Sequence, residues 1–325
     1  MIRPLASLIH RFSAQPALCW WGPLRWCGPL GWCGPLGWCG LGLAAWLALG
    51  LTLRTAPHAA DRPAASPAPG SQPPAAGAVP QASAPAGDAT PAAPAFEPPV
   101  YQILRVKSPP QIDGRLDEPA WFAAPAIDRF EFTWHRAGAR EQSVAKLLYD
   151  DEHLYVGHIC QDAHITARHT QHDGPIPEDD CFEVIFAPNP AHPEVYFNIE
   201  WNVVGGYIDN HRPEGPNKPR AKVWDAEGVV IAGRHVGTLN DDTDRDESWT
   251  CEVAIPLRNF ARYMPALPPV PGSHWNLNLN RHGGQTNPQY SQWSRADTAT
   301  PSFHTPHRFG KAVFSGRTAP FDPAE

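Results

Sequence analysis

Two stretches of the chain alternate strictly between apolar and polar side chains. The first runs from Val195 to Asn202 and the second from Trp275 to Arg281. A period of two predicts β-strands that bury one face and leave the other face wet. The wet positions carry mainly amides and one carboxylate, instead of the Lys, Glu and Thr that usually cover a solvated strand. Amides both donate and accept hydrogen bonds, so this face suits a neutral, polyhydroxylated ligand, and two ordinary half-buried strands are the simpler alternative.

From Val100 onward, short alternating runs are separated by Gly, Pro, Asn and Asp. This spacing is typical of strands joined by turns, and only Pro119–Ala124 indicates a turn of helix. The sequence predicts an all-β fold, an antiparallel β-sandwich of the jelly-roll or immunoglobulin-like class. The nine expected strands are Tyr101–Val106, Val144–Tyr149, Leu154–Ile159, Phe182–Phe186, Val195–Asn202, Val229–Val236, Trp249–Ile255, Trp275–Arg281 and Phe309–Phe314.

The part of the chain before this region has a different composition. Residues 1–60 contain four arginines, no acidic side chain and an apolar run at Leu41–Leu53. They predict a signal peptide or a membrane anchor, and either one places the domain outside the cytoplasm, periplasmic, secreted or tethered to a membrane. Residues 61–98 are rich in Ala and Pro and predict a disordered linker. The expected sandwich covers residues 99–316, and residues 317–325 form a tail.

Charge and cysteine content exclude some functions. The net charge is −7, and no block of Lys and Arg is interleaved with aromatic residues, so the footprint of a nucleic-acid binder is missing. Three of the seven cysteines, Cys160, Cys181 and Cys251, fall in the expected sandwich. At most one pair of them can form a disulfide, and buried free thiols are the first expectation, with Cys251 on the core side of its strand. No CxxC or Cys/His spacing indicates a metal site.

Seven blocks of sequence carry a family resemblance. They are IDGRLDEPAW (112–121), LLYDDEHLYVGHICQD (147–162), EDDCFEVIF (178–186), the strand ending in Trp201 and Asn202, WTCEVAIPL (249–257), WNLNLNR (275–281) and FHTPHRFG (303–310). In this order the blocks resemble carbohydrate-binding module family 9 and its bacterial relatives in the DOMON-like group. The resemblance implies a β-sandwich whose concave sheet, or the rim of that sheet, binds the end of a sugar chain without transforming it.

The resemblance also implies where the sugar binds. In the family, the carboxylate equivalent to Glu183 accepts hydrogen bonds from sugar hydroxyls, and a basic residue stands where this chain has Asn198. Arg281 and Trp293 could add to the site, although the run SQWS (291–294) resembles a buried strand and favours Trp293 as a core residue. The expected carbohydrate contacts are Glu183, Asn198, Glu200, Asn278, Phe303 and His304.

The aromatic clamp of the family is incomplete in this sequence. The two tryptophans that hold the sugar ring in characterised members align with Pro177 or Ile176 and with Phe303. Stacking on the apolar face of the ring supplies much of the affinity in such sites. Trp224 or Tyr207 could replace the missing ring from another loop.

The resemblance further implies structural calcium. Asp113, Asp117 and Glu118 either cap the IDG turn that begins at Ile112 or contribute to such a calcium site. Asp150 and Asp151 are expected to be ordinary residues of a hairpin turn.

Three alternative functions stay open. Glycoside hydrolysis needs two opposed carboxylates, and Glu183 with Glu200 is the one facing pair, but no motif gives either an apolar environment that would raise its pKa. Haem binding, known in DOMON-like relatives, needs axial ligands; the domain has one methionine, Met264, and His158 and His235 are the histidines within strands. A structural cell-surface sandwich would bind neither sugar nor haem.

Overall fold

The computed structural model of the chain describes residues 95–221 and 224–319. The predicted signal or anchor segment, the linker as far as residue 94 and residues 320–325 lie outside the described part. Among the described helices, none is long and apolar enough to cross a membrane.

Nearly all regular structure in the described part is strand. The strands are β1 (Val100–Arg105), β2 (Ser143–Tyr149), β3 (His153–Gln161), β4 (Cys181–Ala187), β5 (Tyr196–Asn202), β6 (Tyr207–Arg212), β7 (Val230–Val236), β8 (Ser248–Pro256), β9 (His274–His282), β10 (Tyr290–Gln292) and β11 (Gly310–Thr318). Helical structure is limited to α2 (Pro119–Ala123) and the 3-10 turns Ile176–Glu178, Leu257–Phe260 and Pro306–Arg308. Each of the nine predicted strands is present, and β6 and β10 are additional.

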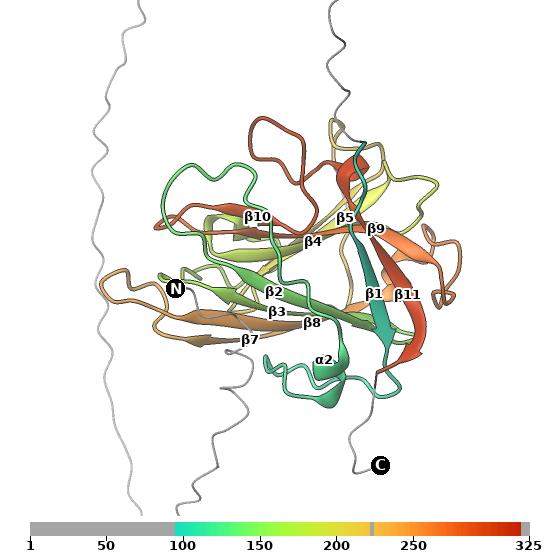
Figure 1. Cartoon of the computed structure of the whole chain (residues 1–325), viewed down its shortest axis with the longest axis horizontal. Coiled ribbons are helices and arrows are strands. Elements are labelled where there is room, and N and C mark those ends of the chain that lie inside the picture. Colours follow the sequence, from blue (N-terminus) through green and yellow to red (C-terminus); the bar gives the residue numbers. More distant parts are fainter. Residues whose placement is uncertain (1–94, 222–223, 320–325) are drawn as a thin grey trace, which may run out of the picture. The chain divides into compact units, whose positions relative to one another are not determined.

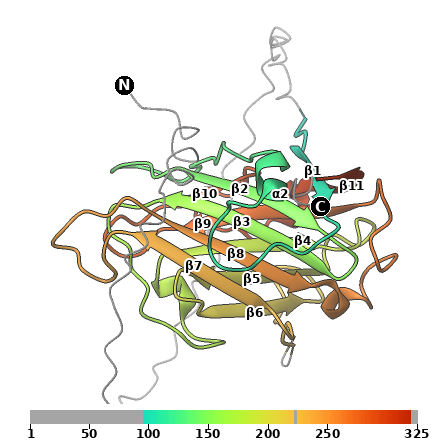
Figure 2. The ribbon, with the colours of Figure 1, turned by 90° about the horizontal axis from the view of Figure 1, so that it is seen from below.

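The strands form one continuous sheet that curls into two layers. Its order is β6-β5-β4-β9-β11-β1-β2-β3-β8-β7, with β10 paired to β9. Figure 1 shows β4, β5, β9 and β10 in the upper layer, β2, β3, β7 and β8 in the lower layer, and β1 with β11 joining the layers at one side. Figure 2, seen from below, shows β7, β8 and β3 side by side in the lower layer. The predicted β-sandwich is confirmed.

The sheet is mixed because of β1. This strand runs parallel to both of its neighbours, β11 and β2, whereas every other pair of strands in the sheet is antiparallel. Parallel neighbours need a long crossover, and residues 106–142, which include α2, provide it between β1 and β2. The prediction of an antiparallel sheet therefore holds everywhere except at β1.

The core lies between the layers and follows the predicted alternation. Phe182 of β4 stacks on His158 of β3 with ring centroids 4.0 Å apart, and Trp249 of β8 meets the same imidazole edge-on at 4.8 Å. His158 is fully buried, and its Nε2 accepts a hydrogen bond from Trp201 Nε1 at 3.0 Å. Burial holds its pKa well below the ordinary value, so the imidazole is neutral and belongs to the core.

The turn before α2 is fastened from the lower layer. Glu252 of β8 accepts hydrogen bonds from the backbone N–H of Gly114 at 2.8 Å and from Trp121 Nε1 at 2.7 Å. Trp121 is completely buried. Asp113 Oδ1 accepts from the N–H of Arg115 at 2.9 Å and so caps the IDG turn, whereas α2 itself has no side-chain cap. Gly114 has φ +84°, which favours glycine.

Candidate functional site

The polar side chains predicted from the two alternating stretches gather on one surface. We call the outer surface of β4, β5, β9 and β10, opposite the core, the amide face. Strand pairing places Glu183 of β4 opposite Glu200 of β5 and Asn280 of β9. It also places Ile185 opposite both Asn198 and Asn278. The amide face comprises Cys181, Glu183, Ile185, Tyr196, Asn198, Glu200, Asn278, Asn280, His282, Tyr290 and Gln292.

Two loops lie over the amide face, and Figure 1 shows them above the upper layer. The backbone of Glu131 pairs with that of Gln292 in β10, and Trp134 Nε1 donates to the carbonyl of Thr298 at 2.8 Å. The first pairing links the 130–138 loop to β10, and the second bond joins it to the 293–309 loop. Polar groups on the face are therefore largely sheltered from water, which strengthens hydrogen bonds made there.

An aromatic cluster stands at the rim of the amide face. The ring of Phe303 lies 5.8 Å from that of Trp134 and 5.9 Å from that of Tyr290, and Trp134 and Tyr290 are 6.3 Å apart. All three rings are half-buried. Rings with one open side are suited to stacking on the C–H face of a sugar.

The two predicted carboxylates share a buried environment. Glu183 is 6% exposed, and its Oε2 accepts a hydrogen bond from Asn280 Nδ2 at 2.8 Å. Burial and then the charge of Glu200 raise the pKa of Glu183 to about 8, and burial also raises the pKa of Glu200. We expected from the sequence no environment that would raise either pKa, and this expectation is wrong because the covering loops remove water from both groups.

Three amide groups on the face keep an acceptor without a partner. The side-chain oxygens of Asn198, Asn280 and Gln292 are buried and have no hydrogen-bond donor within the described part of the chain. Their residues come from three different strands and are at most 3% exposed. Buried polar atoms are normally hydrogen-bonded, so an unpaired group of three on one surface indicates missing donors.

Asn278 holds a loop on the amide face. Its Nδ2 donates to the carbonyl of Ser294 at 2.9 Å, and its Oδ1 accepts from the N–H of Ser294 at 2.8 Å. These two bonds fix the 293–309 loop on the face and use one of the two N–H donors of the amide. The contact of Asn278 with a sugar stays a prediction.

His304 and Phe303 lie on the loop that Asn278 holds. His304 Nδ1 is 3.1 Å from the hydroxyl of Tyr196. Burial and then the positive charges of Arg212 and Arg220 lower the pKa of His304 to about 4, so the imidazole is neutral near pH 7 and can accept a hydrogen bond from the Tyr196 hydroxyl.

The suggested replacements for the missing clamp ring point elsewhere. Trp224 packs on Phe197, a core-facing residue, and Tyr207 stacks on His172. Trp134 stands beside Phe303 instead. Sequence reasoning missed Trp134 because its loop has no periodicity; the only signal was the aromatic density of the segment FEFTWH at residues 130–135.

Comparison with known proteins agrees with this arrangement. The family model described as Carbohydrate-binding family 9 matches residues 121–314, more than half of the chain. The chain belongs to carbohydrate-binding family 9. A comparison with curated protein sequences found no match.

Among solved structures, the family 9 domain is similar to a putative carbohydrate-binding protein of Bacteroides uniformis. The identity is 18%, the match covers 67% of this chain and 100% of the other, and the TM-score is 0.56. A family 9 module of Caldicellulosiruptor kristjanssonii in complex with cellotriose is 15% identical, with 69% and 100% covered and a TM-score of 0.46. A family 9 module of Caldicellulosiruptor kristjanssonii in complex with glucose is 14% identical. The match covers 68% of this chain and 100% of the other, and the TM-score is 0.46. The first likeness supports the fold.

Asp179, in the acidic block EDDCFEVIF of the family 9 domain, fastens a neighbouring loop through hydrogen bonds. Asp179 Oδ2 accepts the backbone N–H groups of Arg168 and His169 at 3.0 Å each, and the amide of Asn202 at 2.8 Å. Asp179 is fully buried. It is therefore neither a solvated charge nor placed as a ligand contact.

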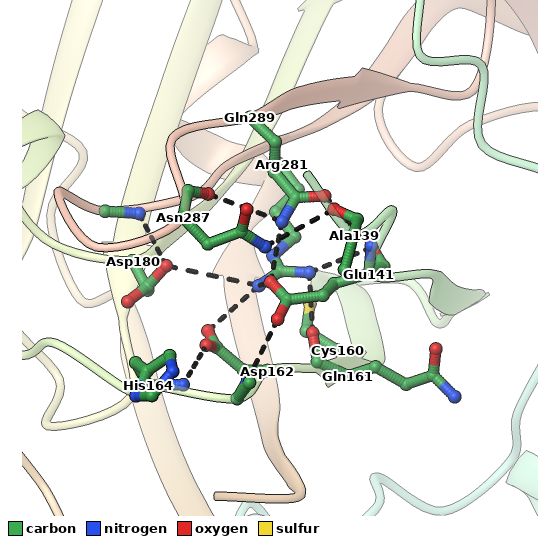
Figure 3. Close-up of polar contacts among 12 residues, drawn as sticks. Ala139, Glu141, Cys160, Gln161, Asp162, His164, Asp180, Arg281, Asn287 and Gln289 are labelled. Carbon is green, nitrogen blue, oxygen red and sulfur yellow. Dashed lines mark hydrogen bonds and ion pairs between the residues drawn. The ribbon is translucent and has the colours of Figure 1, made fainter. Parts of the chain in front are cut away.

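Arg281 does not join the carbohydrate site of the family 9 domain. Its guanidinium is buried at one end of the sandwich, where Nη2 lies 2.9 Å from Asp162 Oδ2 and 3.4 Å from Glu141 Oε2 (Figure 3). Asp180 Oδ1 lies 4.0 Å away and also accepts the N–H of Gly284 at 2.6 Å. Because 281 has the same strand parity as the core residues of β9, the side chain points inward. The side chain therefore links the segment before β2, the segment after β3 and the segment before β4, which belong to both layers.

Two groups of side chains in the described part could hold a metal ion. One consists of Cys181, Glu200 and His282 on the amide face. The other consists of His172, Asp209 and Asp225, and Asp209, Asp225 and Asp173 line a cavity of about 650 Å³ beside β6. Cys160, Cys181 and Cys251 are all free and buried, as first expected.

Proposed function

We propose that this family 9 domain binds the end of a neutral glycan at the rim of the amide face and does not transform it. The observation that carries the proposal is the set of three buried amide oxygens, on Asn198, Asn280 and Gln292, that lack donors beside an aromatic cluster. Sugar hydroxyls supply donors to such oxygens, while aromatic rings contact the sugar's C–H face.

The residues at the rim take separate roles in this proposal. Trp134, Tyr290 and Phe303 provide the stacking surface, which substitutes for the tryptophan pair that the resemblance implies. Glu183 and Glu200, with His304 at the edge, hydrogen-bond the hydroxyls nearest the sheet. Because the pKa of Glu183 is about 8, its carboxyl holds a proton near neutral pH and both donates and accepts. A neutral glycan then faces a site with little net charge.

The two glutamates are proposed to bind rather than to catalyse. Their raised pKa values resemble those of catalytic acids, but they stand directly opposite each other on adjacent strands of one surface. Glycosidases need carboxyls on either side of the scissile bond, about 5 to 9.5 Å apart. Side chains directly opposite on one sheet face begin about 5 Å apart and point in the same direction. Both carboxyls therefore contact a ligand from the same side, whereas hydrolysis needs one carboxyl on each side of the scissile bond.

Haem is disfavoured by the surroundings of the two histidines that the sequence predicted within strands. His158 is fully buried, and its ring nitrogens are 3.0 Å from Trp201 Nε1 and 3.4 Å from Cys160 Sγ. An axial ligand needs a free ring nitrogen facing an open pocket. His235 lies in the exposed part of β7.

We also propose that the domain acts outside the cytoplasm and binds calcium for stability. The composition of residues 1–60 supports export or membrane tethering.

For calcium, the cavity beside β6 fits better than Asp113 and Glu118, whose carboxylates already fasten backbone N–H groups. Asp209 Oδ1 is buried and has no hydrogen-bond partner among the residues that the structure describes, and Asp173 and Asp225 line the same cavity. Carboxylate oxygens are the ligands that calcium prefers.

The test is binding of neutral oligosaccharides to the purified chain, measured by calorimetry, with a visible absorption spectrum of the same sample. The panel includes glucose and cellotriose. We expect a colourless protein that binds a defined sugar end, and we expect Glu183→Gln to weaken that binding. Glu152→Gln, in the exposed β2–β3 turn, is the matched control and leaves binding unchanged. Absence of binding to any neutral glycan by a colourless protein favours a structural sandwich, and a Soret band favours haem.

A further inference from the structure

Three adjacent strands bring a thiol, an imidazole and a carboxylate together on the amide face. Cys181 of β4 is directly opposite His282 of β9. Glu200 of β5 lies diagonally across from Cys181, because Glu200 pairs with Glu183 and Asn202 pairs with Cys181. One ligand atom from each of these three residues lies within 4.8 Å of the other two. Neighbours in sequence do not reveal this group, because it forms only through strand pairing.

The donor atoms define the class of ion. Sulfur and imidazole nitrogen are ligands of zinc and related transition metals, whereas calcium and magnesium take oxygen. Atoms about 2.2 Å from a tetrahedral ion lie about 3.6 Å from one another. Cys181 Sγ and Glu200 Oε1, now 2.7 Å apart through a thiol hydrogen bond, therefore need to separate by only about 1 Å.

We propose that Cys181, Glu200 and His282 bind a zinc-class divalent ion. The ion takes the place of the thiol proton that Cys181 now donates to Glu200, and that proton leaves to solvent. Glu183 stands opposite Glu200, so two carboxyls are held side by side in a site with little water. A cation at this position balances the negative charge of the thiolate and the carboxylates.

Access and orientation suit such an ion. Cys181 is 1% exposed, but Glu200 and His282 are half-buried and open a path from the surface. The imidazole of His282 is stacked on Tyr290 at 4.7 Å with a 12° angle between the rings, which fixes its direction. Three protein ligands leave the fourth position of a tetrahedral ion for water. If a sugar hydroxyl takes that position, the metal also contributes to glycan binding; this last step rests on the proposed function.

The experiment titrates cobalt(II), a coloured stand-in for zinc, into the reduced, metal-free full chain without any sugar. We expect a thiolate-to-cobalt charge-transfer band in the near ultraviolet, which zinc then abolishes. Cys181→Ser keeps a donor to Glu200, and His282→Phe keeps the stacking on Tyr290, so both variants are expected to fold. Each should lower zinc affinity by at least about a hundredfold, beyond the loss typical of an outer-shell partner. Cys251→Ala, which changes a core thiol, should keep the band.

Two results overturn the proposal. The first is a chain that gives no cobalt band while its circular dichroism shows a folded β-sheet. The second is a band that Cys181→Ser and His282→Phe leave unchanged, which assigns the thiolate to other cysteines, such as Cys19, Cys27, Cys33 and Cys39 of the leader. Because no sugar is present, failure of metal binding does not depend on whether the glycan proposal is right.

Discussion

Glu183 of β4 and Glu200 of β5 lie directly opposite each other on the amide face, and burial raises the pKa of both carboxyls. The folded-state pKa of Glu183 is about 8, compared with the ordinary value of 4.5. Between these two values the folded chain holds a proton that the unfolded chain has lost. The free energy of unfolding therefore decreases as pH rises through this window.

We expect Glu183→Gln to flatten this decrease, because glutamine has no proton to lose. The measurement is thermal unfolding from about pH 5 to about pH 9, compared with the unchanged chain. Asp180 and Glu252, whose pKa values burial raises to about 7, keep part of the slope in the variant. Parallel curves for the two proteins would show that Glu183 is charged throughout.

The aromatic cluster gives a second prediction. Trp134→Ala removes the largest ring of the stacking surface, and we expect the dissociation constant for the glycan to rise at least about tenfold, or about 1.4 kcal/mol. Phe122→Ala is the matched control, because Phe122 is 49% exposed on α2, outside the lower layer. Equal binding by both variants would remove Trp134 from the site.

The buried Arg281 gives a third prediction. Arg281→Met leaves Glu141 and Asp162 without their cation, and loss of one partner from a buried ionic network costs about 3–5 kcal/mol. Urea unfolding followed by tryptophan fluorescence measures the change. Arg129→Met, at an exposed position, should change stability by less than about 0.5 kcal/mol. A similarly small change for Arg281→Met contradicts a structural role for the network.

Calcium gives a fourth prediction. At a concentration about a hundred times its dissociation constant, calcium should stabilise the chain by about 2.7 kcal/mol, and a chelator should reverse the effect. Asp209→Asn should abolish this gain, whereas Asp128→Asn, on an exposed loop, should keep it. A gain that survives Asp209→Asn places the ion elsewhere.

Strands with apolar alternation were predictable, and those without it were not. Phe197, Ile199 and Trp201 identify β5 because every second residue enters the core. β6 has the sequence YIDNHR, whose inward positions include Asp209 and His211, so the same rule does not find it. A strand at the sheet edge can carry polar inward residues when a neighbouring loop or cavity accommodates them.

Only those residues of the candidate site that lie on the strands of the amide face were predictable from the sequence. Glu183, Asn198 and Glu200 follow from alternation, because strand pairing then brings them together. Trp134 and Tyr290 come from a loop and a three-residue strand, and their meeting depends on how the loops close over the sheet. Alternation also places Asn278 on the face, but sequence does not show that its amide bonds the backbone of Ser294.

The position of β11 has a consequence for how the protein is made. This strand is the last of the sandwich, yet it is the one that bridges β9 of the upper layer to β1, the first strand. A growing chain that lacks Gly310–Thr318 leaves the edges of β1 and β9 unpaired, so the two layers cannot close into one sheet. The nascent polypeptide therefore keeps these two strand edges unpaired until Gly310–Thr318 has been synthesised.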